Sequence, residues 1–210
     1  MIIKKHFKQN KFLTWKSAEK QESREKLLNQ NKIKELLATH ISTKERLHFY
    51  PELKKIISKL KPKSVLDIAC GLNPIALADK KTIYYASDIK KPNLNLIKKF
   101  FKKNKIKGKV FSHDLKNQFN ILPKADLCLL FKVLDIIEKN PYPLTKKLIT
   151  ELNCKYILIS FSTKTLSGKT MKNPKRIWLR RLLKKLSLKY EVFFSENEIF
   201  YLVTKFSSSL

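Results

Sequence analysis

The sequence of 210 residues is poor in glycine, cysteine and acidic residues. Its three cysteines, Cys70, Cys128 and Cys154, stand far apart and form no C-x-x-C pair. This spacing argues against a zinc site and against a disulfide framework. Two of the cysteines lie within apolar runs, where a reduced cysteine behaves as a small core residue. We therefore expect a protein of a reducing compartment that holds no metal.

Long apolar segments are also missing. No stretch approaches the roughly 18 apolar residues that mark a membrane span, and the opening MIIKKHFKQNKF lacks the apolar core of a signal peptide. The sequence predicts a cytoplasmic protein with no membrane partner.

The shortage of acidic residues leaves a large positive charge. Lys and Arg number 46 against 17 Asp and Glu, which gives a formal net charge of +29. Such an excess repels itself unless a polyanion neutralises it, and nucleic acid is a better candidate than an anionic membrane surface. A lysine-rich proteome would produce part of the same excess in any protein, so charge alone does not establish the partner.

The pattern of apolar residues divides the chain into two parts. Residues from about Trp15 to Leu60 read as helices, because 18–40 and 40–60 carry apolar residues at helical spacing between charges, and Pro62 ends the pattern. Over 61–210, short β-type runs alternate with helical ones, which predicts parallel strands joined by crossover helices. We predict strands at 64–70, 82–89, 108–114, 125–134 and 155–162, and an antiparallel hairpin over 189–206.

This order of elements is similar to that of class I S-adenosylmethionine-dependent methyltransferases. We therefore predict an α/β fold with two parts. A Rossmann-like methyltransferase domain at 61–210 would have a parallel sheet with a C-terminal antiparallel hairpin, and a small helical extension at 1–60 would precede it. The chain length permits one domain of ordinary size plus such an appendage.

The stretch VLDIACGLNPIAL, from Val65 to Leu77, contains the candidate ligand loop. In an open α/β sheet, ligands bind beyond the carboxyl ends of the strands at the switch point. A pyrophosphate favours G-x-G-x-x-G, but here Ala69 and Pro74 stand at the first and third glycine positions. The looser D-x-x-x-G pattern of Asp67 and Gly71 is typical of the methyltransferases. Their cofactor lays its methionine end, which carries no phosphate, against this turn.

Acidic residues also close the second and third predicted strands. Asp88 follows the first strand by roughly 20 residues, the distance at which a carboxylate accepts hydrogen bonds from a ribose diol. Asp114 and Leu115 end the third strand, where an adenine amino group and ring would lie. One aspartate at a strand end is usually a turn former, but acids on three consecutive strands favour S-adenosylmethionine over a nucleotide.

The sequence lacks the marks of two common methyl acceptors. No [DN]-P-P-[YF] turn follows the fourth predicted strand, because NPYP at Asn140 lies too far downstream. Cytosine C5 chemistry needs a cysteine at a strand end, whereas Cys128 lies in mid-strand. Methylation of guanine N7 needs no general base, because the N7 lone pair attacks the sulfonium methyl and no proton has to leave. Positioning of the reactants and electrostatic stabilisation would then account for the rate acceleration.

Four segments together resemble the aminoglycoside-resistance 16S ribosomal RNA (guanine-N7) methyltransferases, the Arm/Rmt family. They are HISTKERL from His40, VLDIACGLNPIAL from Val65, LLFKVLDIIE from Leu129 and SFSTKTLSGK from Ser160. The resemblance implies methyl transfer from S-adenosyl-L-methionine to N7 of a guanine in 16S rRNA, with the assembled small ribosomal subunit as partner. We expect a monomer. Methylation of another structured RNA, or a catalytically silent RNA-binding factor that kept the fold, stays open.

The resemblance implies roles in cofactor binding. Arg46 would reach the carboxylate of the cofactor's methionine end, helped by the turn from Ala69 to Gly71. Asp88 would hold the ribose. Asp114 and Leu115 would hold the adenine. The residues STKE at 42–45 also predict a capping box that starts the helix aiming Arg46, with Ser42 as its N-cap.

Two lysines would face the target nucleotide. Lys132 would lie at the mouth of the pocket, and Lys169 would contact RNA beside it. The sequence departs from the family here, because Lys169 replaces an arginine and loses its bidentate fork. Ser162 and Asp135 each replace a family proline. The extension at 1–60 is also shorter than the family's ribosome-docking domain.

A basic segment follows the last predicted parallel strand. From Lys164 to Lys189 the chain has ten Lys and Arg and no Asp or Glu. Within it, RIWLRRLLKKL at 176–186 is amphipathic, so that Ile177 and the leucines can pack on the sheet while the basic residues face RNA. A solvated helix face would look the same. The predicted RNA-binding residues are Lys164, Lys169, Lys175, Arg176, Arg180, Arg181, Lys184 and Lys185.

Overall fold

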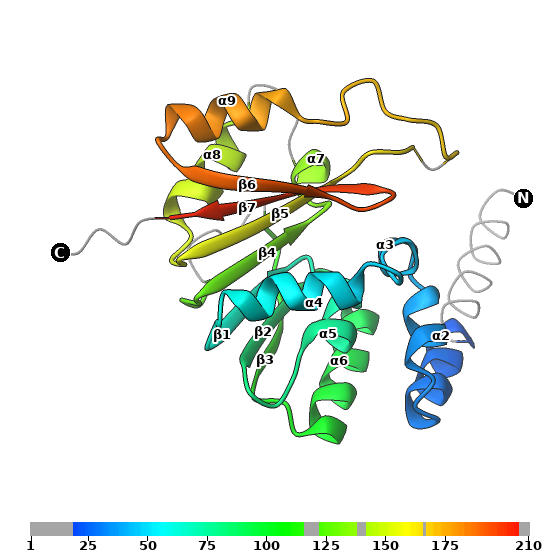
Figure 1. Cartoon of the computed structure of the whole chain (residues 1–210). Coiled ribbons are helices and arrows are strands. Elements are labelled where there is room, and N and C mark those ends of the chain that lie inside the picture. The colour runs from blue at the N-terminus through cyan, green and yellow to red at the C-terminus, as the bar shows by residue number, and fades with distance from the viewer. Residues whose placement is uncertain (1–18, 116–121, 138–141, 166, 206–210) are drawn as a thin grey trace, which may run out of the picture.

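The computed structural model describes residues 19–115, 122–137, 142–165 and 167–205. They form a three-layer α/β fold in which helices cover both faces of one seven-stranded sheet (Figure 1). The strands are β1 (Ser64–Ile68), β2 (Ile83–Asp88), β3 (Gly108–Ser112), β4 (Leu127–Phe131), β5 (Tyr156–Ser162), β6 (Lys189–Phe194) and β7 (Glu198–Thr204). Residues 19–29 are helical, and the helices after them are α2 (Ile33–Ala38), α3 (Ile41–Glu45), α4 (Tyr50–Lys59), α5 (Asn73–Leu77), α6 (Lys91–Asn104), α7 (Leu134–Ile137), α8 (Pro143–Glu151) and α9 (Ile177–Lys185).

The strand order is β3-β2-β1-β4-β5-β7-β6. β1 pairs in parallel with β2 and β4, β2 with β3, and β4 with β5. β7 runs antiparallel to both β5 and β6. This topology confirms the predicted class I methyltransferase fold, with its antiparallel C-terminal hairpin and its helices before β1. In the part of the chain described above, no helix is long and apolar enough to cross a membrane.

The central strands read as unbroken apolar runs because helices cover both of their faces. β4 shows this most clearly, since all five of its residues are buried. Leu127 and Leu129 belong to the core cluster that includes side chains of α4, α5 and α6. Cys128 and Leu130 belong to the cluster that includes side chains of α7, α8 and α9. The alternation of side chains along a strand sends neighbours to opposite faces.

The described helices before β1 pack on the methyltransferase core. Leu36 of α2 and Leu53 of α4 are fully buried in the same cluster as Val65 of β1. Between the helical residues 19–29 and α6, the guanidinium of Arg24 donates to Asn93 Oδ1 at 3.4 Å. The boundary at residue 60 therefore separates two parts that share one core in this structure, and a division into 1–60 and 61–210 stays a prediction.

Two local predictions were wrong. The strand predicted over 125–134 ends at Phe131, and α7 begins at Leu134. The capping box at 42–45 does not form, because α3 begins at Ile41 and its N-cap is His40, which makes no side-chain cap. Ser42 is thus inside the helix.

Candidate active site

Strained backbone marks the carboxyl ends of two neighbouring strands. Ala69 directly follows β1 and has φ 54°, and Lys132 directly follows β4 and has φ 55°. Positive φ at a residue with a side chain costs about 1–3 kcal/mol, and such residues cluster at functional sites. Both are at the point where the strand order reverses, since β1 lies between β2 and β4. This is where an open α/β sheet binds ligands.

A tight turn after β1 is tied to the end of β2. The backbone N–H of Gly71 donates to Asp88 Oδ2 at 2.9 Å, and that of Lys90 donates to Oδ1 at 2.8 Å. Gly71 has φ 55°, a conformation that glycine adopts without steric cost. A Cβ at Gly71 would lie 2.9 Å from the ring of His40. Glycine is therefore required here both by backbone conformation and by the close approach of His40.

His40 joins the segment before the sheet to this turn. Burial, together with the charges of Arg24 and Lys90, lowers the pKa of His40 to about 4. The imidazole is therefore neutral at pH 7, and its Nδ1 has no partner within the described residues.

Asp67 lies beneath the turn and is fully buried. Tyr84 donates its hydroxyl to Asp67 Oδ2 at 2.9 Å. Burial raises the pKa of Asp67 to about 7, against the hydrogen bond from Tyr84 and the charge of Arg46, which lower it. Oδ1 has no hydrogen-bond partner among the residues that the structure describes. A buried carboxylate oxygen without a partner is a place where a ligand can donate a hydrogen bond.

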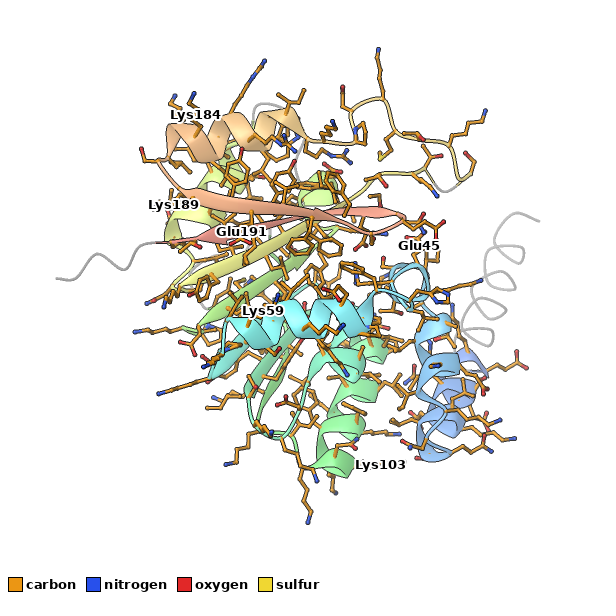
Figure 2. The ribbon with its side chains drawn as sticks, in the orientation of Figure 1. Glu45, Lys59, Lys103, Lys184, Lys189 and Glu191 are labelled. Atoms are coloured by element: carbon orange, nitrogen blue, oxygen red, sulfur yellow. The ribbon has the colours of Figure 1, made fainter. Side chains whose placement is uncertain are left out.

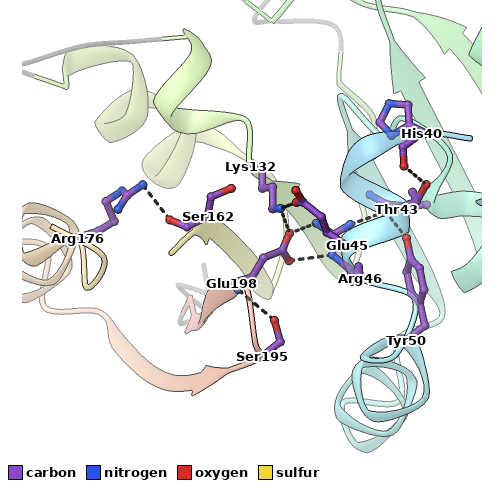
Figure 3. Close-up of polar contacts among 11 residues, drawn as sticks. His40, Thr43, Glu45, Arg46, Tyr50, Lys132, Ser162, Arg176, Ser195 and Glu198 are labelled. Atoms are coloured by element: carbon purple, nitrogen blue, oxygen red, sulfur yellow. Dashed lines mark hydrogen bonds and ion pairs between the residues drawn. The ribbon is translucent and has the colours of Figure 1, made fainter. Parts of the chain in front are cut away.

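Buried charges connect α3, β4 and β7 (Figure 3). Arg46, the C-cap of α3, donates from Nε to Glu198 Oε2 at 2.8 Å and from Nη2 to Oε1 at 2.5 Å. Lys132 Nζ lies 2.9 Å from Glu198 Oε1 and also contacts Glu45. Arg46 Nη1 donates to Asn73 Oδ1 at 2.6 Å. Burial lowers the pKa of Arg46, but the contact with Glu198 outweighs burial and raises it.

Sequence reasoning missed Glu198. It is the last residue of SENE, a segment that in the sequence indicates only a hairpin. Its side chain is 2% exposed, and charged side chains are almost never so buried unless they are paired. The one available signal was that Glu198, an acidic residue, starts a strand whose next five residues, IFYLV, are apolar.

A family model described as ribosomal RNA methyltransferase (FmrO) matches residues 28–185. The chain belongs to this family. A 16S rRNA (guanine(1405)-N(7))-methyltransferase of Serratia marcescens is 34% identical over 146 residues, which is 68% of this chain and 57% of that protein. One from Frankia casuarinae is 27% identical over 64% of this chain and 49% of its own length. The chain thus spans about half the length of these curated relatives.

Solved structures show the same fold. The 16S rRNA methyltransferase RmtF, in complex with S-adenosyl-L-homocysteine, is 25% identical with a TM-score of 0.78, covering 90% of this chain and 76% of that one. The 16S rRNA methylase ArmA is 26% identical with a TM-score of 0.70, covering 89% of this chain and 98% of that one.

In this FmrO-family chain, the predicted adenine-binding residues follow the edge strand β3. Asp114 is half-buried, and Leu115 is buried in the cluster on the side of α7 to α9. Because β3 pairs in parallel with β2 and β2 with β1, these residues lie at the same end of the sheet as Asp88 and Asp67, where the carboxyl ends of these strands meet. The two lysines differ, since Lys132 is in the buried charge network whereas Lys169 is exposed on the loop between β5 and α9 (Figure 1).

The predicted RNA-binding residues fall into two groups. Lys169, Lys175, Arg181, Lys184 and Lys185 are exposed, and Lys184 projects from α9 into solvent (Figure 2). Lys164 and Arg180 are partly buried; Lys164 pairs with Glu196 at 3.2 Å, and Arg180 donates to the hydroxyl of Tyr201 at 3.2 Å.

Arg176 does not belong to this exposed surface. It is 6% exposed, and its Nη2 lies 2.6 Å from Asp135 Oδ2. The arginine thereby links the N-terminus of α9 to α7, so we assign it to the packing of the fold. Ile177, predicted to pack on the sheet, is 55% exposed, and Leu179 and Leu183 are the fully buried residues of α9.

Proposed function

We propose that this chain transfers a methyl group from S-adenosylmethionine to N7 of a guanine in 16S rRNA, within the small ribosomal subunit. Family membership supports the class of reaction. The main structural support is that Arg46, Asp67, Gly71 and Asp88 gather at the strained switch point of the sheet. The relatives are 16S rRNA (guanine(1405)-N(7))-methyltransferases by name.

The residues at this edge fit the cofactor. When bound, S-adenosylmethionine supplies an electrophilic methyl group on its sulfonium. The unpartnered Oδ1 of Asp67 can accept a hydrogen bond from the cofactor's methionine end, and the N–H groups that Arg46 does not use can donate to its carboxylate. Two backbone N–H groups fix the carboxylate of Asp88, and the remaining lone pairs of its oxygens can accept from a ribose diol. Structural support from RmtF is that it binds S-adenosyl-L-homocysteine.

The residues at the switch point also suit a methyl acceptor that needs no general base. Asp88 and Glu198 already accept hydrogen bonds from donors that hold them in place. Guanine N7 loses no proton on methylation, so the chain needs only to align the lone pair with the sulfonium methyl and exclude water. Lys132 directly follows β4 at the switch point, and we propose that it lies beside the target nucleotide.

The exposed lysines and arginines of α9 and of the β5–α9 loop would bind the RNA backbone. They project from one end of the molecule (Figure 2), and the net charge of +29 is of the sign that phosphates neutralise. We also propose that 1–60 contributes to docking on the ribosome, because this segment adjoins the site: α3 within it ends at Arg46, its C-cap. Docking and catalysis would then share one element.

The decisive experiment incubates the chain with purified small ribosomal subunits and S-adenosylmethionine labelled in its methyl group. Borohydride reduction and aniline cleavage then map N7-methylguanine in the 16S rRNA. The matched variant is Asp88→Asn, which keeps the shape but removes the charge. We expect one cleavage site with the wild type and a strong loss with Asp88→Asn.

Other outcomes would contradict the proposal in distinguishable ways. Label in the RNA without a cleavage site would mean a different atom or base, and label only in another RNA would mean a different substrate. If calorimetry showed no heat with S-adenosylmethionine, the chain would be a basic RNA-binding protein that kept the fold.

A further inference from the structure

Glu198 contacts both of the cations that the proposed function places at the site. Its Oε2 accepts from Arg46 Nε at 2.8 Å, and its Oε1 lies 2.5 Å from Arg46 Nη2 and 2.9 Å from Lys132 Nζ. Figure 3 shows the carboxylate of Glu198 between the two side chains. One anion thus serves two cations that come from different layers of the fold.

The backbone around Glu198 is fixed by the sheet and by the β6–β7 turn. Glu198 pairs with Ser162 at the end of β5. Its N–H donates to Ser195 Oγ at 3.1 Å, and its carbonyl accepts from the N–H of Ser195 at 2.9 Å. The N–H of Thr163 donates to the carbonyl of Asn197 at 2.9 Å. The backbone that carries Glu198 is therefore held in place, and the carboxylate itself is held by its contacts with Arg46 and Lys132.

Glu45 is the natural comparison within the same network. It also contacts Lys132, but its side chain is 33% exposed, whereas that of Glu198 is 2% exposed. Glu45 makes no salt bridge to Arg46 in the part of the chain that the structure describes. When an anionic ligand approaches Lys132, Glu45 can leave the lysine, because its carboxylate is exposed enough to be hydrated by water. Glu198 cannot leave in this way, because its departure would leave the charge of Arg46 buried and unpaired.

We infer that Glu198 is the positioning residue of the site: it holds Arg46 toward the cofactor's carboxylate and Lys132 toward the target nucleotide. This inference rests on the proposed function, which assigns those two destinations. In this role Glu198 would act through the two cations that it contacts. Glu45 is the exchangeable partner, which neutralises Lys132 until an anion takes its place.

The test compares three Glu→Gln variants of the full chain. Glu198→Gln removes the shared charge, Glu45→Gln removes the exposed partner, and Glu191→Gln removes an exposed charge from β6 of the same hairpin. Calorimetry gives the Kd for S-adenosylmethionine, and methylation of small subunits gives kcat and KM. The number of cofactor sites per chain reports the folded fraction.

We expect Glu198→Gln to weaken S-adenosylmethionine binding at least tenfold and to lower kcat at least a hundredfold per folded molecule. Glu45→Gln should weaken cofactor binding much less than Glu198→Gln, because among the described residues the salt bridge of Arg46 is to Glu198 and not to Glu45. Glu191→Gln should behave as wild type. Glu198→Asp keeps the charge on a shorter side chain, so it should lie between wild type and Glu198→Gln.

A purely structural role would lower the melting temperature of Glu198→Gln but leave Kd and kcat per folded molecule unchanged, and this result would overturn the inference. If Glu198→Gln does not fold, a wild-type Kd and kcat in Glu198→Asp would overturn it equally. A wild type that neither binds the cofactor nor methylates subunits would refute the proposed function itself, and the inference with it.

Discussion

Replacing Asp67 by asparagine should change how the stability of the protein depends on pH. The carboxyl group is fully buried, and burial raises its pKa from 3.8 to about 7. Between these two values the native state keeps a proton that the unfolded state has lost. The group therefore contributes stability that is fully present below pH 3.8 and is lost as the pH rises through 7.

The expected size follows from these two pKa values. Linkage predicts that between pH 5 and pH 8 the wild type loses about 2.5 kcal/mol of unfolding free energy through this one group. Asp67→Asn is neutral throughout, and its amide oxygen can still accept from Tyr84, so the variant should lack this loss. Relative to wild type, the variant should therefore gain stability as the pH rises.

The assay is urea unfolding of both proteins at half-unit steps from pH 5 to pH 8, read as the difference in unfolding free energy. Taking a difference cancels the titration of other groups, including His40. Asp79→Asn is the matched control, because Asp79 is exposed and accepts from backbone N–H groups. If the curves of Asp67→Asn and wild type ran parallel, the buried carboxyl would be ionised throughout, and the reasoning from burial would be refuted.

Three further predictions concern the turn and the basic surface. The pKa of His40 is about 4 in the folded protein, against the ordinary value of 6.5. The wild type should therefore lose unfolding free energy as the pH falls from 6.5 toward 4, and urea unfolding of His40→Gln should show a smaller loss. An equal loss in both proteins would place His40 in solvent. Gly71→Ala and Gly168→Ala each add about 1–2 kcal/mol of backbone strain at positive φ. Only the new Cβ of Gly71→Ala meets the ring of His40, so this variant should lower the melting temperature more than Gly168→Ala. Equal decreases in melting temperature would contradict that contact. The double variant Arg180→Ala and Arg181→Ala should reduce the slope of log K against log salt for RNA binding by about 1–2; an unchanged slope would mean that α9 does not face RNA.

The fold could be predicted because its signals are local. LCLLF is apolar at all five positions and SVLDI at three of five, and short apolar stretches of this kind between helical patterns predict parallel strands covered on both faces. The short turn SENE leaves room only for a hairpin, which fixed β6 and β7 as antiparallel neighbours. Gly71 could be singled out in a chain with so few glycines, because a strand-to-helix turn needs the conformation that glycine permits.

Tertiary structure alone decided which charges meet and what environment each one has. Arg46 and Glu198 are 152 residues apart in the chain, and no periodicity relates them. Arg176 reads as one more basic residue of an amphipathic helix, yet its pairing with Asp135 buries it. The raised pKa of Asp67 likewise comes from the layers packed around it. Hydrophobic patterning determines which segments are buried, because it acts over a few residues. The partners of a buried charge depend on how distant segments pack.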